Sequence, residues 1–252
     1  MKRLVPIAAS LALALAAAPA AACSVGADYR VPTNLELAGH ADTIVLARVV
    51  GAHQDGEGRQ TAVVIRPLET IKGAPQEGDI ALQGMTLAST DGSSRLSDPY
   101  ELARPHEQAY AGACIRTVFP LGTTALFFLR TDHEGMWAPA GTAFSRWAED
   151  VTDAQSPWVQ LARLYAVAAA LPPEDRPPFL EDEREALLAR AGQDDPTGPL
   201  ARLMAEDITR QLAGPAPPPP DAFEDAFRDP SARSTVDATL QAMRQAAAEE
   251  GD

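Results

Sequence analysis

The sequence predicts a mixed α+β protein, in which a small, mainly β barrel or sandwich is followed by a helical segment and an acidic tail. The first half carries short apolar runs rich in β-branched residues, separated by glycine-bearing turns, as is typical of an antiparallel sheet. From residue 156 onward the apolar residues recur at helical spacing. We therefore expect a β domain at 23–148, a helical segment at 149–213, a proline-rich linker at 214–220 and a tail at 221–252.

The first 22 residues have the composition of an export signal. Met1-Lys2-Arg3 supplies a positive start, an apolar stretch follows from Leu4 to about Ala18, and Ala20-Ala21-Ala22 forms a small-residue cleavage site. The apolar stretch is shorter than the roughly 20 residues that a membrane-spanning helix needs, and no later stretch approaches that length. The mature chain is therefore expected to begin at Cys23, without a transmembrane segment, in the periplasm or outside the cell.

The predicted β domain opens with a short helix and two long strands. A capping box formed by Thr33 and Glu36 starts about two turns of helix. Apolar runs then predict strands at Thr43–Val50 and Thr61–Ile71, and Pro67 predicts a bulge or an edge position because proline cannot donate to a sheet. Further strands are expected at Asp79–Gln83, Thr124–Leu129 and Met136–Pro139.

The helical segment carries three amphipathic stretches, each with a proline near its first turn. They are expected to form helices at Pro157–Leu171, Pro178–Ala191 and Pro199–Leu212. The linker at 214–220 is rich in proline, which favours an extended polyproline II spacer. Because the tail at 221–252 is acidic and follows that spacer, we expect it to be disordered when alone.

Acidic residues outnumber basic ones and are concentrated in the second half of the chain. The formal charge is −14, and it becomes −16 once Lys2 and Arg3 of the export signal are removed. Residues 23–148 carry 14 acidic and 10 basic side chains, whereas residues 149–252 carry 21 and 9. Nucleic acids and anionic lipids bind basic surfaces, so neither is expected as a partner. A solvated, solubilising face explains the acidity of the second half.

The chain has only two cysteines, Cys23 and Cys114. In an oxidising compartment this distant pair is expected to form one disulfide, worth on the order of 3–5 kcal/mol in the chain-entropy model. The alternative is lipidation of Cys23, which directly follows the small residues of a cleavage site. Ala20 stands where a bacterial lipoprotein site usually has leucine, and a lipid anchor would leave Cys114 unpaired.

Known catalytic motifs are absent from the sequence. It has no Gly-x-Ser-x-Gly, His-Glu-x-x-His, Walker, Gly-x-Gly-x-x-Gly or Cys-x-x-Cys pattern. The four histidines lack ligand spacing and lie in predicted turns or helix ends, where we expect them to be solvated; they are His40, His53, His106 and His133. Adjacent carboxylates at Glu149-Asp150 and Glu181-Asp182-Glu183 are interpreted as helix starts. We therefore expect no enzyme, no metal and no cofactor.

One polar stretch, Gly84–Ala113, is longer than an ordinary connection between strands. A loop of this length in a compact domain is either mobile or functional. A third function class is an enzyme that uses this loop, although we can name no nucleophile or base for it.

A set of short motifs follows a fixed order along the first half of the chain. The order is Cys23, Ala41-Asp42 at the start of a strand, a second strand ending in Ile71-Lys72-Gly73, and a later Cys114. This pattern resembles the netrin-like fold, whose best-known members are the tissue inhibitors of metalloproteinases. The resemblance covers about residues 23–140 and extends to a group of uncharacterised secreted bacterial proteins. It implies an OB-type β barrel to which the N-terminal cysteine is disulfide-bonded.

The resemblance also implies a binding mechanism. In the tissue inhibitors, the free amine and the carbonyl of the mature N-terminal cysteine chelate the catalytic zinc of a protease. By this likeness Cys23, Ser24 and Val25 form a partner-binding end, since an α-amine with a pKa near 8 is a competent zinc ligand. The inhibitors open with Cys-x-Cys and carry several disulfides, whereas this chain has a single cysteine there. Cys23 could therefore serve only to staple the N-terminus to the barrel.

These features predict an exported, non-enzymatic binding protein of the cell envelope with a protein partner. Its most specific version is a protease inhibitor that acts on a metalloprotease through Cys23, Ser24 and Val25. The alternative is a lipid-anchored structural or scaffolding protein, in which Cys23 is acylated and the acidic helices contact a partner.

Overall fold

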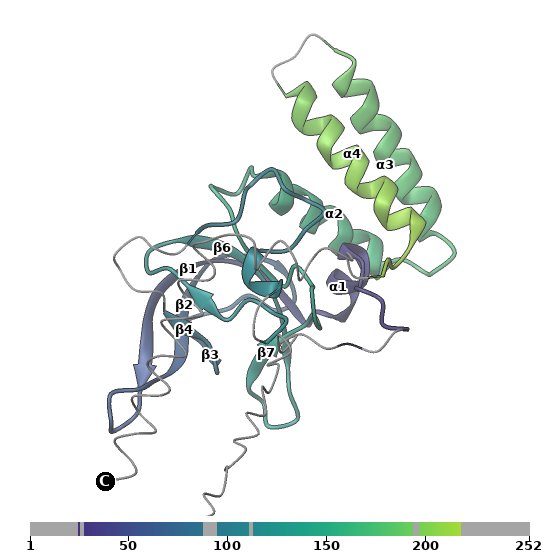
Figure 1. Ribbon diagram of the computed structural model, residues 1–252. Helices are drawn as coiled ribbons and strands as arrows, with labels where there is room; N and C mark the ends of the chain where they lie inside the picture. The colour runs from purple at the N-terminus through teal and green to yellow at the C-terminus, as the bar shows by residue number, and fades with distance from the viewer. Residues whose placement is uncertain (1–24, 26–27, 88–94, 111–112, 194–196, 218–252) are drawn as a thin grey trace, which may run out of the picture.

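The computed structural model describes residue 25 and the ranges 28–87, 95–110, 113–193 and 197–217. Within them the chain forms a mixed α+β structure, as the sequence predicts, with a curled antiparallel sheet and four α-helices (Figure 1). The predicted export signal, Cys23, Ser24 and the predicted tail at 221–252 lie outside the described residues.

The main sheet has six strands, all paired in antiparallel fashion. Their bounds are β1 Thr43–Gln54, β2 Gln60–Lys72, β3 Ile80–Gln83, β6 Thr124–Thr131, β7 Trp137–Pro139 and β8 Ala148–Asp150. The hydrogen-bonded order is β3-β2-β1-β6-β7, and β8 pairs with the part of β6 that β7 leaves uncovered. Two further short strands, β4 (Thr86–Leu87) and β5 (Val118–Phe119), form a separate parallel pair.

Both faces of the central strands are covered, as their unbroken apolar sequences predict. Successive residues of a strand point to opposite faces, so the neighbours Phe127 and Phe128 of β6 show what covers each face. Phe128 stacks on Trp158 of α2 (Pro157–Ala170), with 5.4 Å between the ring centroids. Phe127 instead packs against Phe119 and Trp147, at 5.5 and 6.1 Å. The central strands thus lie between α2 and an inner aromatic cluster.

Strand β2 contains the bulge that Pro67 predicts. Leu46 of β1 pairs with Glu69, whereas the next residue, Ala47, pairs with Pro67, so Leu68 is the extra residue of β2. Leu68 is 53% exposed. A bulge of this kind increases the local twist and bends the strand, which helps a sheet to curl.

The sheet curls until its two end strands approach each other. Strands β3 and β7 stand at opposite ends of the strand order, yet they lie in contact without pairing their backbones (Figure 1). The result is an open half-barrel with a seam between β3 and β7.

The first helix, α1 (Asn34–His40), begins with the predicted capping box. The Glu36 N–H donates to the Thr33 hydroxyl at 3.1 Å, and the Thr33 N–H donates to the Glu36 carboxylate at 2.9 Å. Leu37 and Ala38 are buried, so α1 covers part of the half-barrel beside α2.

The last two helices, α3 (Arg176–Ala191) and α4 (Gly198–Ala213), form a hairpin that projects away from the sheet (Figure 1). It is attached through Asp207 of α4, which is fully buried. The Asp207 carboxylate accepts from the Tyr165 hydroxyl of α2 at 2.6 Å and from the Asn34 amide of α1 at 3.2 Å. Three helices therefore meet at one carboxylate. All three long helices start and end within two residues of their predicted bounds.

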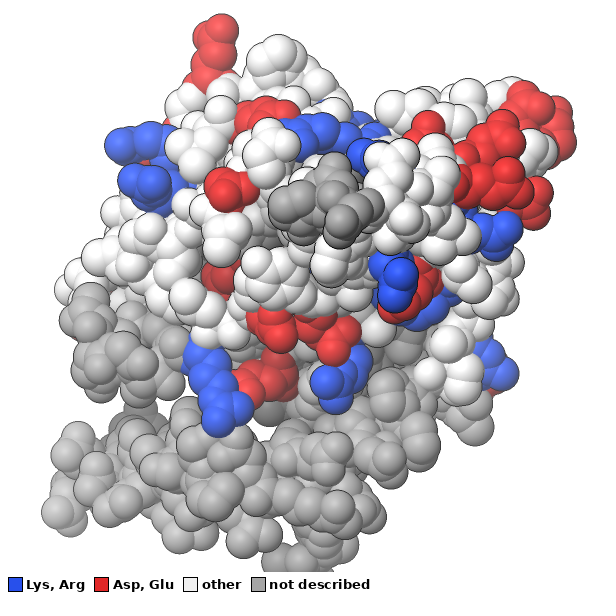
Figure 2. Space-filling model, turned by 90° about the horizontal axis from the view of Figure 1, so that it is seen from above, with Lys and Arg blue, Asp and Glu red and all other residues white. Residues whose placement is uncertain are grey.

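Two interpretations of acidic pairs are wrong. Glu149 and Asp150 do not start a helix but lie buried in β8, so the predicted boundary between 148 and 149 falls inside a strand of the sheet. The run Glu181-Asp182-Glu183 lies in the second turn of α3, whose first turn has no acidic residue. Exposed acidic residues of α3 include Glu181, Asp182 and Glu185. Acidic side chains gather at one end of the molecule in Figure 2.

None of the helices in the described part of the chain is long and apolar enough to cross a membrane.

Candidate functional site

The N-terminal segment that leads to α1 is fastened to the protein at two points. The Tyr29 hydroxyl donates to the Ala143 carbonyl at 2.6 Å, and the Val31 N–H donates to the Ala216 carbonyl at 2.9 Å. The second contact joins this segment to the start of the proline-rich linker. Of the predicted partner-binding end, only Val25 is described.

Tyr29 lies against an aromatic corner formed by Phe144 and Tyr110. The ring of Phe144 is 6.4 Å from that of Tyr29 and stacks on that of Tyr110 at 5.7 Å. Burial raises the pKa of Tyr110 to about 12, so its phenol stays protonated. Phe144 and Cys114 both adopt left-handed backbone conformations, with φ of 58° and 59°, and the Phe144 N–H donates to the Cys114 carbonyl at 2.8 Å. Each such residue costs about 1–2 kcal/mol, so the surrounding contacts hold this corner in a strained state.

Cys114 therefore belongs to the corner on which the N-terminal segment rests. It carries no free thiol. Because Cys23 lies outside the described residues, the Cys23–Cys114 disulfide stays a prediction.

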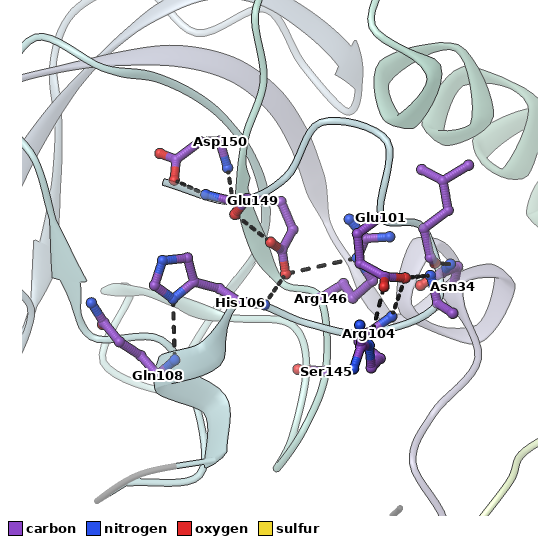
Figure 3. Close-up of polar contacts among 12 residues, drawn as sticks. Asn34, Glu101, Arg104, His106, Gln108, Ser145, Arg146, Glu149 and Asp150 are labelled. Carbon is purple, nitrogen blue, oxygen red and sulfur yellow. Dashed lines mark hydrogen bonds and ion pairs between the residues drawn. The ribbon is translucent and has the colours of Figure 1, made fainter. Parts of the chain in front are cut away.

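Four charged side chains lie buried together at β8 and form what we call the buried charge cluster: Arg116, Arg146, Glu149 and Asp150. Figure 3 shows the last three of them. Nη2 of Arg116 is 2.8 Å from the Asp150 carboxylate, and these side chains are 1% and 6% exposed. Nε of Arg146 is 3.7 Å from the Glu149 carboxylate, and these are 5% and 2% exposed. Two cations and two anions balance each other, which makes their burial tolerable.

Aromatic faces support both guanidinium groups. Arg116 lies over the ring of Phe119 and Arg146 over that of Trp158, each 4.6 Å from the ring centroid. Cation–π contacts are strongest where water is excluded, as here. Within the described residues, Nε and Nη1 of Arg146 have no hydrogen-bond partner, so aromatic contact and the nearby carboxylate substitute for hydrogen bonds.

The carboxylates of the cluster also fasten the loop at 95–110, which is the described middle of the long polar stretch. Asp150 accepts from the Ser97 N–H at 2.9 Å, and Glu149 accepts from the Ser97 hydroxyl at 2.5 Å. Glu149 also accepts from the His106 N–H at 2.9 Å. Part of the stretch predicted to be mobile or functional is thus tied to the sheet by charge-assisted hydrogen bonds.

His106 contradicts the expectation of a solvated histidine, because it is only 5% exposed. Its Nδ1 accepts from the Gln108 N–H at 3.2 Å, and its Nε2 lies 3.0 Å from the Arg95 carbonyl. Nε2 therefore carries the proton and donates to that carbonyl. Burial, followed by the charge of Arg116, lowers the pKa of His106 below its usual value. The ring is neutral near pH 7.

The other three histidines are exposed, as predicted. His40 ends α1, His53 lies in β1, and His133 lies in the turn between β6 and β7. His53 is thus in a strand and not in a turn. No group of three or more potential metal ligands occurs among the residues that the structure describes.

The groups of the buried charge cluster bind one another and the loop, including the Ser97 hydroxyl that donates to Glu149, and each of the four residues, taken whole, is at most 5% exposed. This arrangement holds the 95–110 loop against β8 through hydrogen bonds to the Glu149 and Asp150 carboxylates.

Two shallow grooves lie elsewhere. One, of about 300 Å³, is at the tip of the α3–α4 hairpin near Pro199 and Arg202. The other, of about 480 Å³, lies at the seam of the half-barrel and is lined by Gln83, Trp137 and Pro139 among others. Neither groove includes a residue of the buried charge cluster.

No protein-family model matches this chain, and no curated protein or solved structure shows significant similarity to it.

Proposed function

We propose that this chain is an exported, non-enzymatic binding protein of the cell envelope, built on an OB-type, netrin-like half-barrel, and that it binds a protein partner through its N-terminal end. The observation that carries the proposal is the fastening of the N-terminal segment by Tyr29 and Val31 beside the strained corner at Cys114. A chain end held on a rigid support loses little conformational entropy when a partner binds it.

The geometry supports a Cys23–Cys114 disulfide as the third fastening point. Cys23 precedes Tyr29 by six positions, and an extended chain of that length spans at most about 20 Å. Tyr29 contacts Phe144, which is hydrogen-bonded to Cys114. The bridge would therefore hold the mature N-terminus against the aromatic corner.

The most specific version of this proposal is inhibition of a zinc metalloprotease. The α-amine and carbonyl of Cys23 would bind the zinc of the protease, and Ser24 and Val25 would occupy its substrate groove. Nitrogen and oxygen are both ordinary zinc ligands. The amine must be unprotonated to bind, so inhibition should weaken as the pH falls below about 8.

An inhibition assay on the mature, oxidised protein tests this version against purified zinc metalloproteases. The matched control is a variant with one extra alanine before Cys23, which keeps the disulfide but moves the free amine. We expect inhibition by the mature protein and at least a tenfold loss in the control. The inhibitor version is wrong if no zinc protease of the compartment is slowed, or if the extra residue makes no difference.

A lipid-anchored scaffolding protein is the second candidate, because Cys23 follows a small-residue cleavage site. The intact mass of the exported protein distinguishes the two. A mature chain that gains two hydrogens on reduction supports the disulfide-fastened binding protein, whereas a diacylglyceryl group on Cys23 supports the anchored scaffold.

A further inference from the structure

The 95–110 loop is attached to β8 near its two ends, at Ser97 and at His106. Ser97 binds Glu149 and Asp150, and the Asp150 N–H donates to the Ser97 hydroxyl at 3.1 Å. The second attachment is His106, whose backbone N–H donates to the Glu149 carboxylate. Between these points the loop contributes Leu102 to the core and exposes Tyr100. None of these hydrogen bonds belongs to a strand pair of the main sheet, so the loop can loosen from β8 while the sheet stays paired.

The His106 ring joins the two ends of this loop. Its Nε2–H donates to the carbonyl of Arg95, two residues before Ser97. Its Nδ1 accepts from the Gln108 N–H (Figure 3). A second proton would have to bind at Nδ1. There it would face the Gln108 N–H, a donor, and the hydrogen bond between them would be lost. The doubly protonated ring has no acceptor at this position among the contacts that the structure describes.

The charges around His106 act on a second proton in both directions, and the repulsion by Arg116 is the largest of them. Arg116, just before β5, carries the repelling cation, while Glu149 and Asp150 of β8 attract. Both carboxylates are already engaged with guanidinium groups, Asp150 with Arg116 and Glu149 with Arg146. On the helical turn η1 (Glu107–Tyr110) of the loop itself, Glu107 is exposed and pairs with Arg95. Protonation of His106 would thus add an uncompensated positive charge to a balanced, buried cluster.

We propose that His106 is an acid-sensitive latch: its protonation detaches the 95–110 loop from β8 and exposes the buried charge cluster, while the main sheet stays folded. An exported protein meets the pH of its surroundings directly, so such a latch would let the loop respond to acidification. Histidine is the side chain that changes charge in this range.

The direction of the pH dependence follows from the lowered pKa of His106. In the detached loop the ring has its ordinary pKa of about 6.5, whereas in the closed loop its pKa is lower. Attachment is therefore strongest above about pH 6.5 and weakens as the pH falls toward the pKa of the closed form. Between these two values the opening equilibrium rises by up to about tenfold per pH unit.

Amide hydrogen exchange of the mature, oxidised protein tests the proposal when it is measured by mass spectrometry between about pH 7.5 and 5 and corrected for the chemical exchange rate. We expect peptides covering 95–110 to exchange faster in acid, while peptides of β1 and β6 keep their protection. In the His106→Gln variant, whose side chain cannot gain a proton in this range, the acid-dependent increase should vanish. His133→Gln, at a fully exposed histidine, is the matched control and should retain it.

An NMR titration of the histidine rings in the unmodified protein serves as the second measurement, so that a folding failure of His106→Gln leaves the proposal testable. The His106 resonance should titrate together with the amides of the loop. The proposal is overturned if loop exchange does not depend on pH, if His106→Gln keeps the full pH dependence, or if His106 stays neutral until the whole protein unfolds.

Discussion

Replacing Arg116 by methionine should be among the most damaging single changes in this protein. The Arg116 guanidinium is 1% exposed and pairs at 2.8 Å with the Asp150 carboxylate, which is 6% exposed. In Arg116→Met, that carboxylate stays buried with the Ser97 N–H as its closest remaining partner, at 2.9 Å. Removing one member of a buried ion pair costs about 3–5 kcal/mol, because the remaining charge loses its compensation. The contact of Arg116 with the Phe119 ring is lost as well.

Urea unfolding, followed by tryptophan fluorescence, measures this cost. Trp147 and Trp158 are both fully buried. Trp147 contacts Phe119, the ring over which the Arg116 guanidinium lies. In a protein of this size, 3–5 kcal/mol corresponds to a fall in Tm of about 6–20 °C. The exposed pair of Arg59 and Asp55 supplies the control, and Arg59→Met should leave stability nearly unchanged.

A double variant separates the lost charge pair from lost packing. In Arg116→Met/Asp150→Asn the buried position no longer holds an uncompensated charge, so the double change should be less destabilising than Arg116→Met alone. The reasoning fails if Arg116→Met loses less than about 1 kcal/mol, as an exposed ion pair would. It also fails if the effects of the two substitutions simply add.

Three further changes test the contacts that hold the elements together, each measured by the same unfolding assay. Gly73→Ala should lose at least about 2 kcal/mol, because Gly73 has a φ of +90° and an added Cβ would lie 2.5 Å from the Asp42 carbonyl; an unchanged Tm would contradict this. Tyr165→Phe removes the 2.6 Å donor of the fully buried Asp207 and should lose about 1–3 kcal/mol, with loosened amide protection of α4. Thr33→Ala removes the helix cap of α1 and should lose about 1 kcal/mol, whereas Thr33→Ser should restore it.

Local sequence patterns were reliable wherever short-range chemistry decides the structure. The capping box at Thr33 predicts α1, the β-branched runs predict β1 and β2, and Pro67 predicts the bulge. The proline positions predict the three long helices. These features depend on backbone and side-chain groups a few residues apart, so their outcome is nearly independent of the rest of the chain.

The buried charge cluster could not be predicted from local sequence patterns. Glu149 and Asp150 look like solvated acidic residues at a helix start, and His106 looks like a turn histidine in a polar stretch. Arg116 is 34 residues away from Asp150 along the chain, and no local pattern links them. The one available signal was the cluster of charged residues beside tryptophan and phenylalanine, and that signal does not reveal burial.

By itself, the sequence determined the four helices, the longer strands and the net negative charge of the chain. Only the tertiary structure decided which charges are buried, that β8 joins the sheet at the predicted domain boundary, and that the N-terminal segment rests on the corner at Cys114. The reason is physical. Local propensities act over a few residues, whereas the burial of a charge depends on whether distant segments supply a counter-charge and exclude water at the same place.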